Sequence, residues 1–228
     1  MGRAGADARA ALGPVTGMGR GSGMAETVDA GFLVRWLVAV AEAVDREADR
    51  LTELDSAIGD ADHGANLKRG FASVTETLAK EPPASPGAVL VTAGRQLVST
   101  VGGASGPLYG TLLRRAGKSL GEDGEVTRER LAEALDAGVA AVSQLGGARP
   151  GDKTMLDALV PGVEGLRSSY EAARAAAEEG ALATVPLRAR KGRASYLGGR
   201  SVGHQDPGAT SSALLLAALA DTARTEEA

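Results

Sequence analysis

The chain lacks cysteine and has few aromatic residues. Cysteine is absent from all 228 positions, and phenylalanine, tryptophan and tyrosine together make up 3% of the sequence. Without cysteine there is neither a disulfide framework nor a thiolate zinc site, and covalent thiol chemistry is excluded. With few rings available, the core must be built from Leu, Val and Ala, which favours closely packed helices over sheets. The composition therefore predicts an all-α protein.

A basic face and a long apolar run are missing as well. The formal net charge is -4, and there is no dense Lys/Arg run, so we expect no nucleic-acid partner. No uninterrupted apolar stretch approaches the roughly 20 residues that span a bilayer, so we expect no membrane segment. These features predict a soluble, cytoplasmic protein.

The length fits one domain preceded by a short extension. Residues 1–24 are rich in Gly and Arg and lack the apolar core of a secretory signal, so we interpret them as a disordered N-terminal extension. Met24 is a candidate for the true start, because periodic sequence begins soon after it. A role of the extension in organellar targeting is the alternative. Residues 25–228 are predicted to form a single helical domain.

Apolar residues recur at helical spacing along most of the chain from Phe32 onward. Helices are predicted over residues 32–54, 65–80, 87–101, 107–120, 127–145, from about 152 to a break at Pro161–Gly162, then over 164–180 and 208–225. This pattern gives about eight helices joined by short loops. Four of the loops are unusually polar or rich in glycine, which makes them candidates for function.

The strongest local pattern is a cluster of three carboxylates, Asp55, Asp60 and Asp62, in eight positions. At about 4 Å, two like charges repel by about 4 kcal/mol at an effective dielectric of 20, so the cluster calls for a cation. Oxygen-only ligands favour Mg²⁺ before Ca²⁺. A continuous helix would hold Asp60 away from the other two, so the intervening glycines must break it. The alternative is a solvated acidic turn in which Asp60 and Asp62 serve only as caps.

The residues after this cluster start a helix. Asp62 is placed to cap it, and the first amide groups, at Gly64, Ala65 and Asn66, would then point at an anion lying against the metal. Phosphate oxygens are suited to bridge the metal and these amide groups. His63 alone is weak evidence, because a histidine beside aspartates is as often a hydrogen-bonding loop residue as a ligand.

A glycine-rich loop follows at residues 102–107. Its missing side chains let the backbone approach a ligand, while Ser105 offers a hydroxyl and an amide group. The loop resembles a phosphate cradle, although a tight turn between two helices explains it equally well. The chain has no Walker A motif and no protein-kinase glycine loop.

Two further loops are polar. In the run Gly151-Asp152-Lys153-Thr154-Met155, the simplest interpretation makes Asp152 a helix cap and Lys153 a solvated side chain. Met155 is either core or an adaptable wall for a planar base.

The segment 192–211 is long for an inert connector. Within it, Arg193 is suited to meet a phosphate. Asp206 most simply caps the last helix, and holding a ligand hydroxyl is the alternative.

Four motifs occur in order and together carry a family resemblance. They are D-x-x-I-G-D-x-D-H-G-x-N from Asp55, GG-x-S-GPLYG from Gly102, GDKTM from Gly151 and GRASYLG-x-R-x-x-G-H-Q-DPGA from Gly192. From Phe32 to the C-terminus the chain resembles the DhaL family, the ADP-binding subunits of bacterial dihydroxyacetone kinases that draw phosphate from the phosphoenolpyruvate-dependent phosphotransferase system.

The resemblance implies an all-α antiparallel barrel of about eight helices with a nucleotide site at one end. It implies that Asp55, Asp60 and Asp62 hold two Mg²⁺ ions that bridge the diphosphate of ADP or ATP. It also implies the residues that surround the nucleotide: His63, Gly64, Ala65, Asn66, Ala104, Ser105, Gly146, Met155, Arg193, Asp206, Pro207 and Gly208. No catalytic residue beyond this site is implied.

The implied function is that of a phosphotransferase, the ADP-binding subunit of a dihydroxyacetone kinase in glycerol metabolism. Bound ADP would receive a phosphoryl group from a phosphohistidine donor protein and pass it to dihydroxyacetone on a partner subunit. Phosphoryl transfer needs positioned phosphates and charge neutralisation more than a local nucleophile, which fits these motifs. Two alternatives stay open: an ATP-exchanging kinase subunit for a small ketose, and a regulatory module that binds a transcription factor according to its nucleotide state. A homodimer is compatible with each.

Overall fold

The computed structural model describes residue 1 and residues 27–226, so the predicted extension lies, apart from Met1, outside the described residues. The described part is mostly helical, as composition predicted, with one small sheet that was not expected. Its elements in chain order are β1 (Thr27–Asp29), α1 (Ala30–Ile58), α2 (His63–Lys80), α3 (Pro86–Thr100), α4 (Ser105–Leu120), β2 (Glu125–Thr127), α5 (Arg128–Gly146), α6 (Leu156–Leu166), α7 (Tyr170–Leu182), the 3₁₀ helix η1 (Arg193–Ser201) and α8 (Pro207–Thr225). Within residues 27–226, no helix is both long and apolar enough to cross a membrane.

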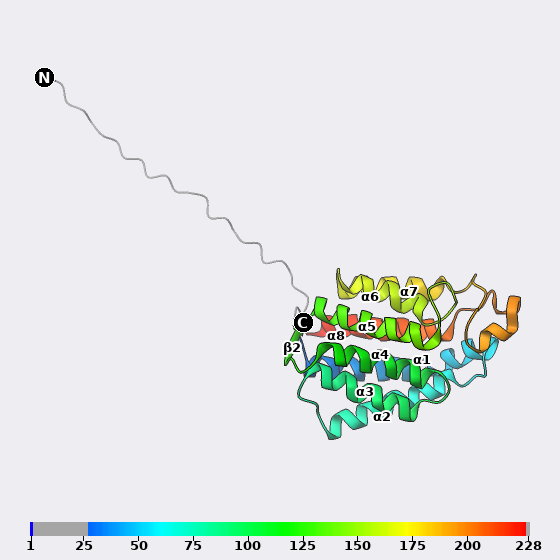
Figure 1. Ribbon diagram of the computed structural model, residues 1–228, viewed down its shortest axis with the longest axis horizontal. Helices are drawn as coiled ribbons and strands as arrows, with labels where there is room; N and C mark the ends of the chain where they lie inside the picture. The colour runs from blue at the N-terminus through cyan, green and yellow to red at the C-terminus, as the bar shows by residue number, and fades with distance from the viewer. Residues whose placement is uncertain (2–26, 227–228) are drawn as a thin grey trace.

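Each α-helix contacts the next one along the chain, and α8 returns to contact α1. The helices lie side by side and reverse direction at every connection (Figure 1). As a result, the loops after α1, α3, α5 and α7 gather at one end of the molecule together with η1. The N-terminal ends of α2, α4, α6 and α8 face that same end, while the sheet lies at the other.

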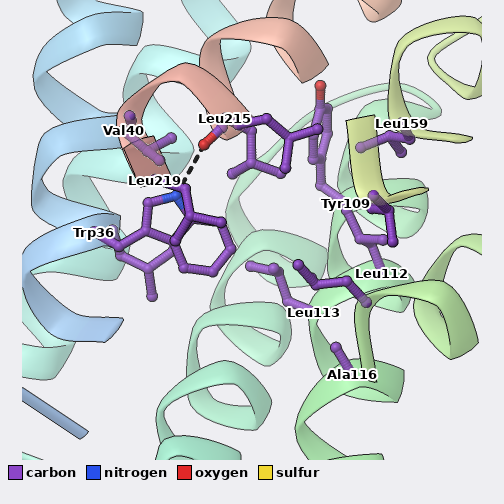
Figure 2. Packing of buried hydrophobic residues seen from close by; sticks show 14 of the residues in the cluster. Trp36, Val40, Tyr109, Leu112, Leu113, Ala116, Leu159, Leu215 and Leu219 are labelled. Atoms are coloured by element: carbon purple, nitrogen blue, oxygen red, sulfur yellow. Dashed lines mark hydrogen bonds between the residues drawn. The ribbon is translucent and has the colours of Figure 1, made fainter. Parts of the chain in front are cut away.

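The core is built mainly from Leu, Val and Ala, with a few aromatic rings between the helices (Figure 2). Trp36 of α1 is fully buried, and its indole Nε1 donates a hydrogen bond of 2.9 Å to the carbonyl oxygen of Leu215 in α8. Tyr109 of α4 is 1% exposed and packs edge-on against Phe71 of α2. Burying one large apolar side chain stabilises the fold by about 1.5–3 kcal/mol, so these few rings add to a core made mainly of aliphatic residues.

A two-stranded antiparallel sheet joins the start of α1 to the start of α5. β1 pairs with β2 so that Val28 lies opposite Val126. Each strand runs straight into a helix whose cap it supplies, since Asp29 accepts from the amide of Phe32 and Thr127 accepts from the amide of Arg130. Composition could not reveal this sheet, because its strands are three residues long and lie almost 100 residues apart.

The predicted break at Pro161–Gly162 is wrong. α6 continues through Pro161 and ends at Leu166, and α7 starts at Tyr170 with Ser169 as its cap. Proline removes one ladder hydrogen bond, but tertiary packing outweighs that loss here. A Cβ atom at Gly162 would lie 2.3 Å from Leu216 Cδ1, so α6 approaches α8 closely at this turn.

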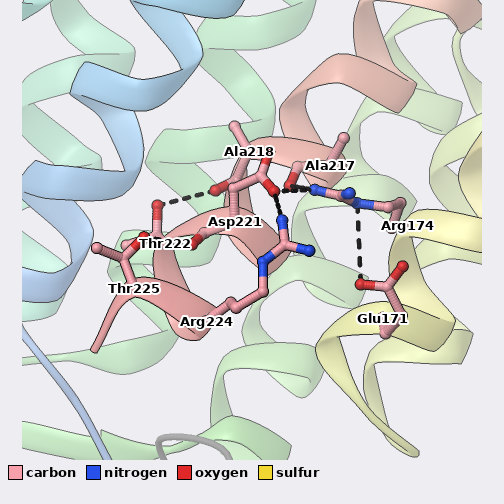
Figure 3. Close-up of polar contacts among 8 residues, drawn as sticks. All are labelled: Glu171, Arg174, Ala217, Ala218, Asp221, Thr222, Arg224 and Thr225. Atoms are coloured by element: carbon pink, nitrogen blue, oxygen red, sulfur yellow. Dashed lines mark hydrogen bonds and ion pairs between the residues drawn. The ribbon is translucent and has the colours of Figure 1, made fainter. Parts of the chain in front are cut away.

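Polar contacts tie α7 to α8 on the outer surface (Figure 3). Arg174 of α7 pairs with Asp221 of α8, and its Nη2 donates a hydrogen bond of 2.9 Å to the carbonyl oxygen of Ala217. Arg224 also pairs with Asp221. Exposed ion pairs contribute at most about 1 kcal/mol each, so their main effect is on orientation. They hold together the two helices that bracket the long segment 183–206.

Candidate functional site

A cavity of about 550 Å³ opens at the end of the molecule where the four loops gather. The first residues of four helices line it, namely His63 of α2, Ser105 of α4, Leu156 of α6 and Pro207 of α8. A helix N-terminus carries roughly half a positive charge and unpaired amide groups, and it favours a bound anion. Four such ends around one cavity make it suited to a ligand with several negative charges.

The three aspartates meet at the rim of this cavity. One carboxylate oxygen from each of Asp55, Asp60 and Asp62 lies within 4.8 Å of the others. Asp55 is 8% exposed, and the other two are exposed. Three converging carboxylates match the all-oxygen ligand set of a hard divalent cation, so the residues present fit Mg²⁺.

The backbone around Gly59 produces this convergence. α1 ends at Ile58, and a Cβ atom at Gly59 would lie 2.0 Å from Asp55 Oδ1. Ala61 follows in the left-handed conformation, with φ 61°, which is rare and costly for residues other than glycine. The prediction that a glycine must end the helix is thus correct for Gly59. Gly64 lies inside α2 instead, where a Cβ atom would be 2.0 Å from the carbonyl oxygen of Ala48.

The predicted capping role of Asp62 is wrong. Asp62 occupies the N-cap position of α2, but its side chain makes no capping hydrogen bond. Oδ2 of Asp55 performs this role, accepting from the amide nitrogen of Asp62 at 3.0 Å and from that of His63 at 3.2 Å. Since Asp55 caps α2 from the preceding helix, the carboxylate of Asp62 is free to join the cluster.

His63 links three helices beneath the cavity. Its Nδ1 lies 3.1 Å from Ser105 Oγ in α4, and its Nε2 lies 2.9 Å from Ser211 Oγ in α8. The hydroxyl of Tyr109 lies 2.7 Å from the same Ser211 Oγ. Burial lowers the pKa of His63, while Asp55 and Asp62 oppose that effect. Local sequence offered only weak evidence for a role of His63, because its partners lie 42 and 148 positions away.

Most of the other residues implied by the resemblance also line the cavity. They are Ala104, Ser105, Gly146, Met155, Arg193, Asp206, Pro207 and Gly208. Gly64, Ala65 and Asn66 lie outside the lining, although they belong to the first turn of α2. Asn66 is 8% exposed, and its Oδ1 accepts a hydrogen bond of 2.6 Å from Arg69.

Asp206 caps α8, as the simplest interpretation of the sequence predicted. Its Oδ2 accepts a hydrogen bond of 2.7 Å from the amide nitrogen of Ala209. The pKa of Asp206 is raised to about 7, mainly by burial and to a lesser extent by the nearby Asp157. The amide groups of Ala209 and Gly208 and the ammonium of Lys153 oppose this rise. This carboxyl therefore titrates near neutral pH when no ligand covers it.

The prediction that Lys153 is solvated is wrong. Lys153 is 1% exposed, and its ammonium donates to the carbonyl oxygens of Thr184 at 2.8 Å, Leu187 at 3.2 Å and His204. Burial lowers its pKa, whereas Asp206 and Asp157 raise it. The three carbonyl groups lie more than 30 residues along the chain, so no local pattern could reveal them.

Asp152, predicted to cap the next helix, turns back instead. Its Oδ2 accepts from the amide nitrogen of Arg149. The N-cap residue of α6, Met155, makes no side-chain capping hydrogen bond, and Asp157 in the first turn of the helix accepts from the loop amide nitrogens of Gly151 at 2.5 Å and Thr154 at 2.7 Å. The loop is therefore ordered by a carboxylate that lies after it rather than inside it.

Comparisons with known proteins agree on one family. The family model described as the DAK2 domain matches residues 57–221. Over 202 residues the chain is 45% identical to "PEP-dependent dihydroxyacetone kinase, ADP-binding subunit DhaL" of Escherichia coli, covering 84% of this chain and 96% of that protein. It is 41% identical over 199 residues to the ADP-binding subunit DhaL of kinase 1 from Listeria innocua, covering 86% of this chain and 98% of that protein.

The fold is also found in a solved structure. The crystal structure of the dihydroxyacetone kinase from C. freundii in complex with AMP-PNP and Mg²⁺ matches with a TM-score of 0.68 and 24% sequence identity. The match covers 94% of this chain and 38% of that longer one.

Proposed function

The chain belongs to the DAK2-domain family, and on that basis we propose that it is the ADP-binding, phosphoryl-transfer subunit of a dihydroxyacetone kinase. Relatives named as ADP-binding subunits match it over nearly their whole length. The observation that carries the proposal is the meeting of Asp55, Asp60 and Asp62 at the rim of a cavity walled by four helix N-termini. Carboxylates for a metal and amide groups for an anion are what a metal-bound diphosphate requires.

In this proposal the three aspartates hold two Mg²⁺ ions. The buried carboxylate of Asp55 is already fixed by two backbone amide groups. The exposed carboxylate of Asp60 pairs with Arg193, and that of Asp62 makes no capping hydrogen bond. When bound, the ions supply charge neutralisation to the phosphate oxygens.

The residues around the cavity would divide the binding of the nucleotide between them. Ser105 at the start of α4 lies beside His63 at the start of α2, which supports a phosphate position between these two helix ends. Gly64, Ala65 and Asn66 would contribute through the backbone of the same α2 turn. Met155 is 5% exposed and supplies an apolar wall suited to a planar base. The turn from Asp206 through Pro207 to Gly208 lines the cavity beside Met155, whose amide nitrogen lies 3.5 Å from the position of a Cβ atom at Gly208.

Arg193 stands at the mouth of the cavity, with Ala104 and Gly146 among the other lining residues. Its guanidinium is suited to hold phosphate oxygens in a bidentate way. Transfer would then depend on positioning and electrostatic stabilisation. The phosphoryl donor is proposed to be a phosphohistidine protein of the phosphotransferase system. Dihydroxyacetone would be held by a partner subunit, with all three proteins in the cytoplasm.

The neighbour order of the helices supports an antiparallel barrel. Successive helices contact each other and α8 contacts α1, which closes the ring. We propose that residues 25–228 form this single domain.

The experiment is to denature the purified protein, identify any released nucleotide by mass spectrometry, and measure turnover with the cognate dihydroxyacetone-binding subunit. Stoichiometric ADP, together with turnover that requires phosphoenolpyruvate and the phosphotransferase proteins, is the expected result. An empty protein that turns over with ATP would instead establish the ATP-exchanging alternative. Failure to bind either nucleotide with Mg²⁺ present would contradict the proposal.

A further inference from the structure

The aromatic residues of this chain fall into two groups. Five of the six, Phe32, Trp36, Phe71, Tyr109 and Tyr170, are at most 1% exposed, whereas Tyr196 is 89% exposed. All six lie in the described part of the chain. Tyrosine is among the side chains that contribute most to protein interfaces, so this exposed ring is a candidate contact residue.

The 3₁₀ helix η1 places Tyr196 beside the mouth of the cavity. In such a helix, residues three apart lie on the same side. Ala194 and Leu197 turn inward and pack with Ile58 of α1. Arg193 and Tyr196 share another side, and Arg193 reaches the rim of the cavity. Tyr196 itself does not line the cavity, so it is next to the site without belonging to it.

The segment that carries Tyr196 is strongly basic. Residues 183–205 contain five Arg or Lys residues and no Asp or Glu, although the whole chain has a net charge of -4. All five cations are exposed: Arg188, Arg190, Lys191, Arg193 and Arg200. A basic segment on a protein of negative net charge attracts an acidic surface of a partner and orients it during association.

Hydrogen bonds at the base of residues 183–205 hold this segment in place. At its base, the amide nitrogen of Gly203 donates a hydrogen bond of 2.9 Å to the carbonyl oxygen of Val185, and that of Ala189 donates one of 2.9 Å to Ser201 Oγ. The ammonium of Lys153 joins both ends of the segment from below. A surface that is ordered before binding loses little entropy when a partner docks.

We propose that Tyr196, Arg188 and Arg200 form a docking surface for an acidic face of the subunit that carries the phosphoryl acceptor. This inference rests on the proposed function and extends it. Arg188 lies against Gly198 in η1, since its Nη2 is 3.4 Å from the position of a Cβ atom there. The acceptor has to reach a phosphoryl group at the mouth of the cavity, and Tyr196 stands beside that mouth. The Tyr196 ring is the anchor, and the two arginines set the orientation.

The test varies the concentration of the cognate dihydroxyacetone-binding subunit in steady-state assays. Tyr196→Ala and Arg200→Glu are each expected to raise the apparent KM for that subunit about tenfold or more. Affinity for ADP with Mg²⁺, measured by calorimetry, should stay unchanged. Tyr196→Phe should retain the wild-type KM. The matched control is Arg115→Glu, the same charge change at an exposed position on α4, which should alter neither value.

The outcomes separate the inference from the function on which it rests. Wild-type KM values in both Tyr196→Ala and Arg200→Glu, with turnover intact, would overturn the docking surface alone. A loss of ADP affinity in Tyr196→Ala would also overturn it, because the ring would then belong to the nucleotide site. Absence of turnover by the wild-type protein with this subunit, under either donor, would instead defeat the proposed function.

Discussion

Nη2 of Arg193 lies 2.9 Å from Oδ2 of Asp60, and this ion pair joins η1 to the turn between α1 and α2. Both side chains are substantially exposed, at 69% and 36%, so the pair contributes less than about 1 kcal/mol to folding. Its main effect is to hold a guanidinium at the edge of the aspartate cluster. A bound diphosphate would offer the same guanidinium new oxygen partners.

Arg193→Ala is therefore expected to leave the thermal midpoint within a few degrees of wild type. Diphosphate affinity or the transfer rate should fall by about ten- to a hundredfold, as for the loss of a hydrogen bond to a charged group. Calorimetry with ADP and single-turnover transfer assays measure the two effects. Arg95→Ala, at an exposed position on α3, is the control. Wild-type affinity and rate in Arg193→Ala would remove this residue from the site.

Gly59→Ala tests the close approach between this glycine and Asp55. The added methyl group would lie 2.0 Å from Asp55 Oδ1, so the carboxylate has to move away from the cluster. We expect Mg²⁺-dependent ADP affinity to fall at least about tenfold, which corresponds to roughly 1.4 kcal/mol. Gly124→Ala is the control, because a Cβ atom there would meet nothing within 4 Å. Equal affinities in the two variants would show that Asp55 has room to adjust.

Lys153→Met tests the buried ammonium. The change leaves the carbonyl groups of Thr184, Leu187 and His204 without their shared donor. We expect a loss of about 2–4 kcal/mol in the free energy of unfolding, measured in urea. Hydrogen exchange should become faster in residues 184–206. Lys118→Met, an exposed lysine on α4, should change neither quantity, and unaltered exchange in Lys153→Met would show that the segment is held by other contacts.

The pKa of Asp206 predicts a pH dependence of stability. Burial raises this pKa from 3.8 to about 7, so the folded state holds a proton that the unfolded state has already released across that interval. The unligated protein should therefore lose stability as pH rises from about 4 to 7, by up to about 1.4 kcal/mol per unit. Asp206→Asn keeps an acceptor at the cap and removes the titration. Urea melts at pH 5 and pH 8 should show a larger decrease for wild type than for the variant, and parallel decreases would contradict the assignment.

Features that depend on nearby residues, such as helices and their caps, were largely predictable from the sequence. Helical periodicity predicted eight helical segments, of which the sixth and seventh were divided at the wrong residues, and Asp206 caps the last helix as expected. The convergence of the three aspartates was also predictable, since they lie within eight positions and Gly59 ends the helix that carries Asp55; that they bind a metal stays a prediction. The sheet and the buried contacts of Lys153 were beyond such reasoning.

These failures share a physical reason. The partners of Lys153 lie 31, 34 and 51 residues away, and a buried ammonium is only favourable once those carbonyl groups converge on it. Capping of α2 by Asp55 instead of Asp62 is similar, because it depends on the left-handed turn at Ala61. The exposure of Tyr196 was also not predictable locally, because it depends on Ala194 and Leu197 being the residues of η1 that pack inward.

The most direct measurement is calorimetric titration of ADP into nucleotide-free protein, with Mg²⁺ and then with EDTA, for wild type and for Asp62→Ala. Binding should require Mg²⁺ in the wild type and be lost in Asp62→Ala, while circular dichroism shows the same helicity in both. Asp123→Ala, an exposed carboxylate in the loop before β2, should bind as wild type does. ADP binding that persists in EDTA, or in Asp62→Ala, would contradict a nucleotide site built on the aspartate cluster.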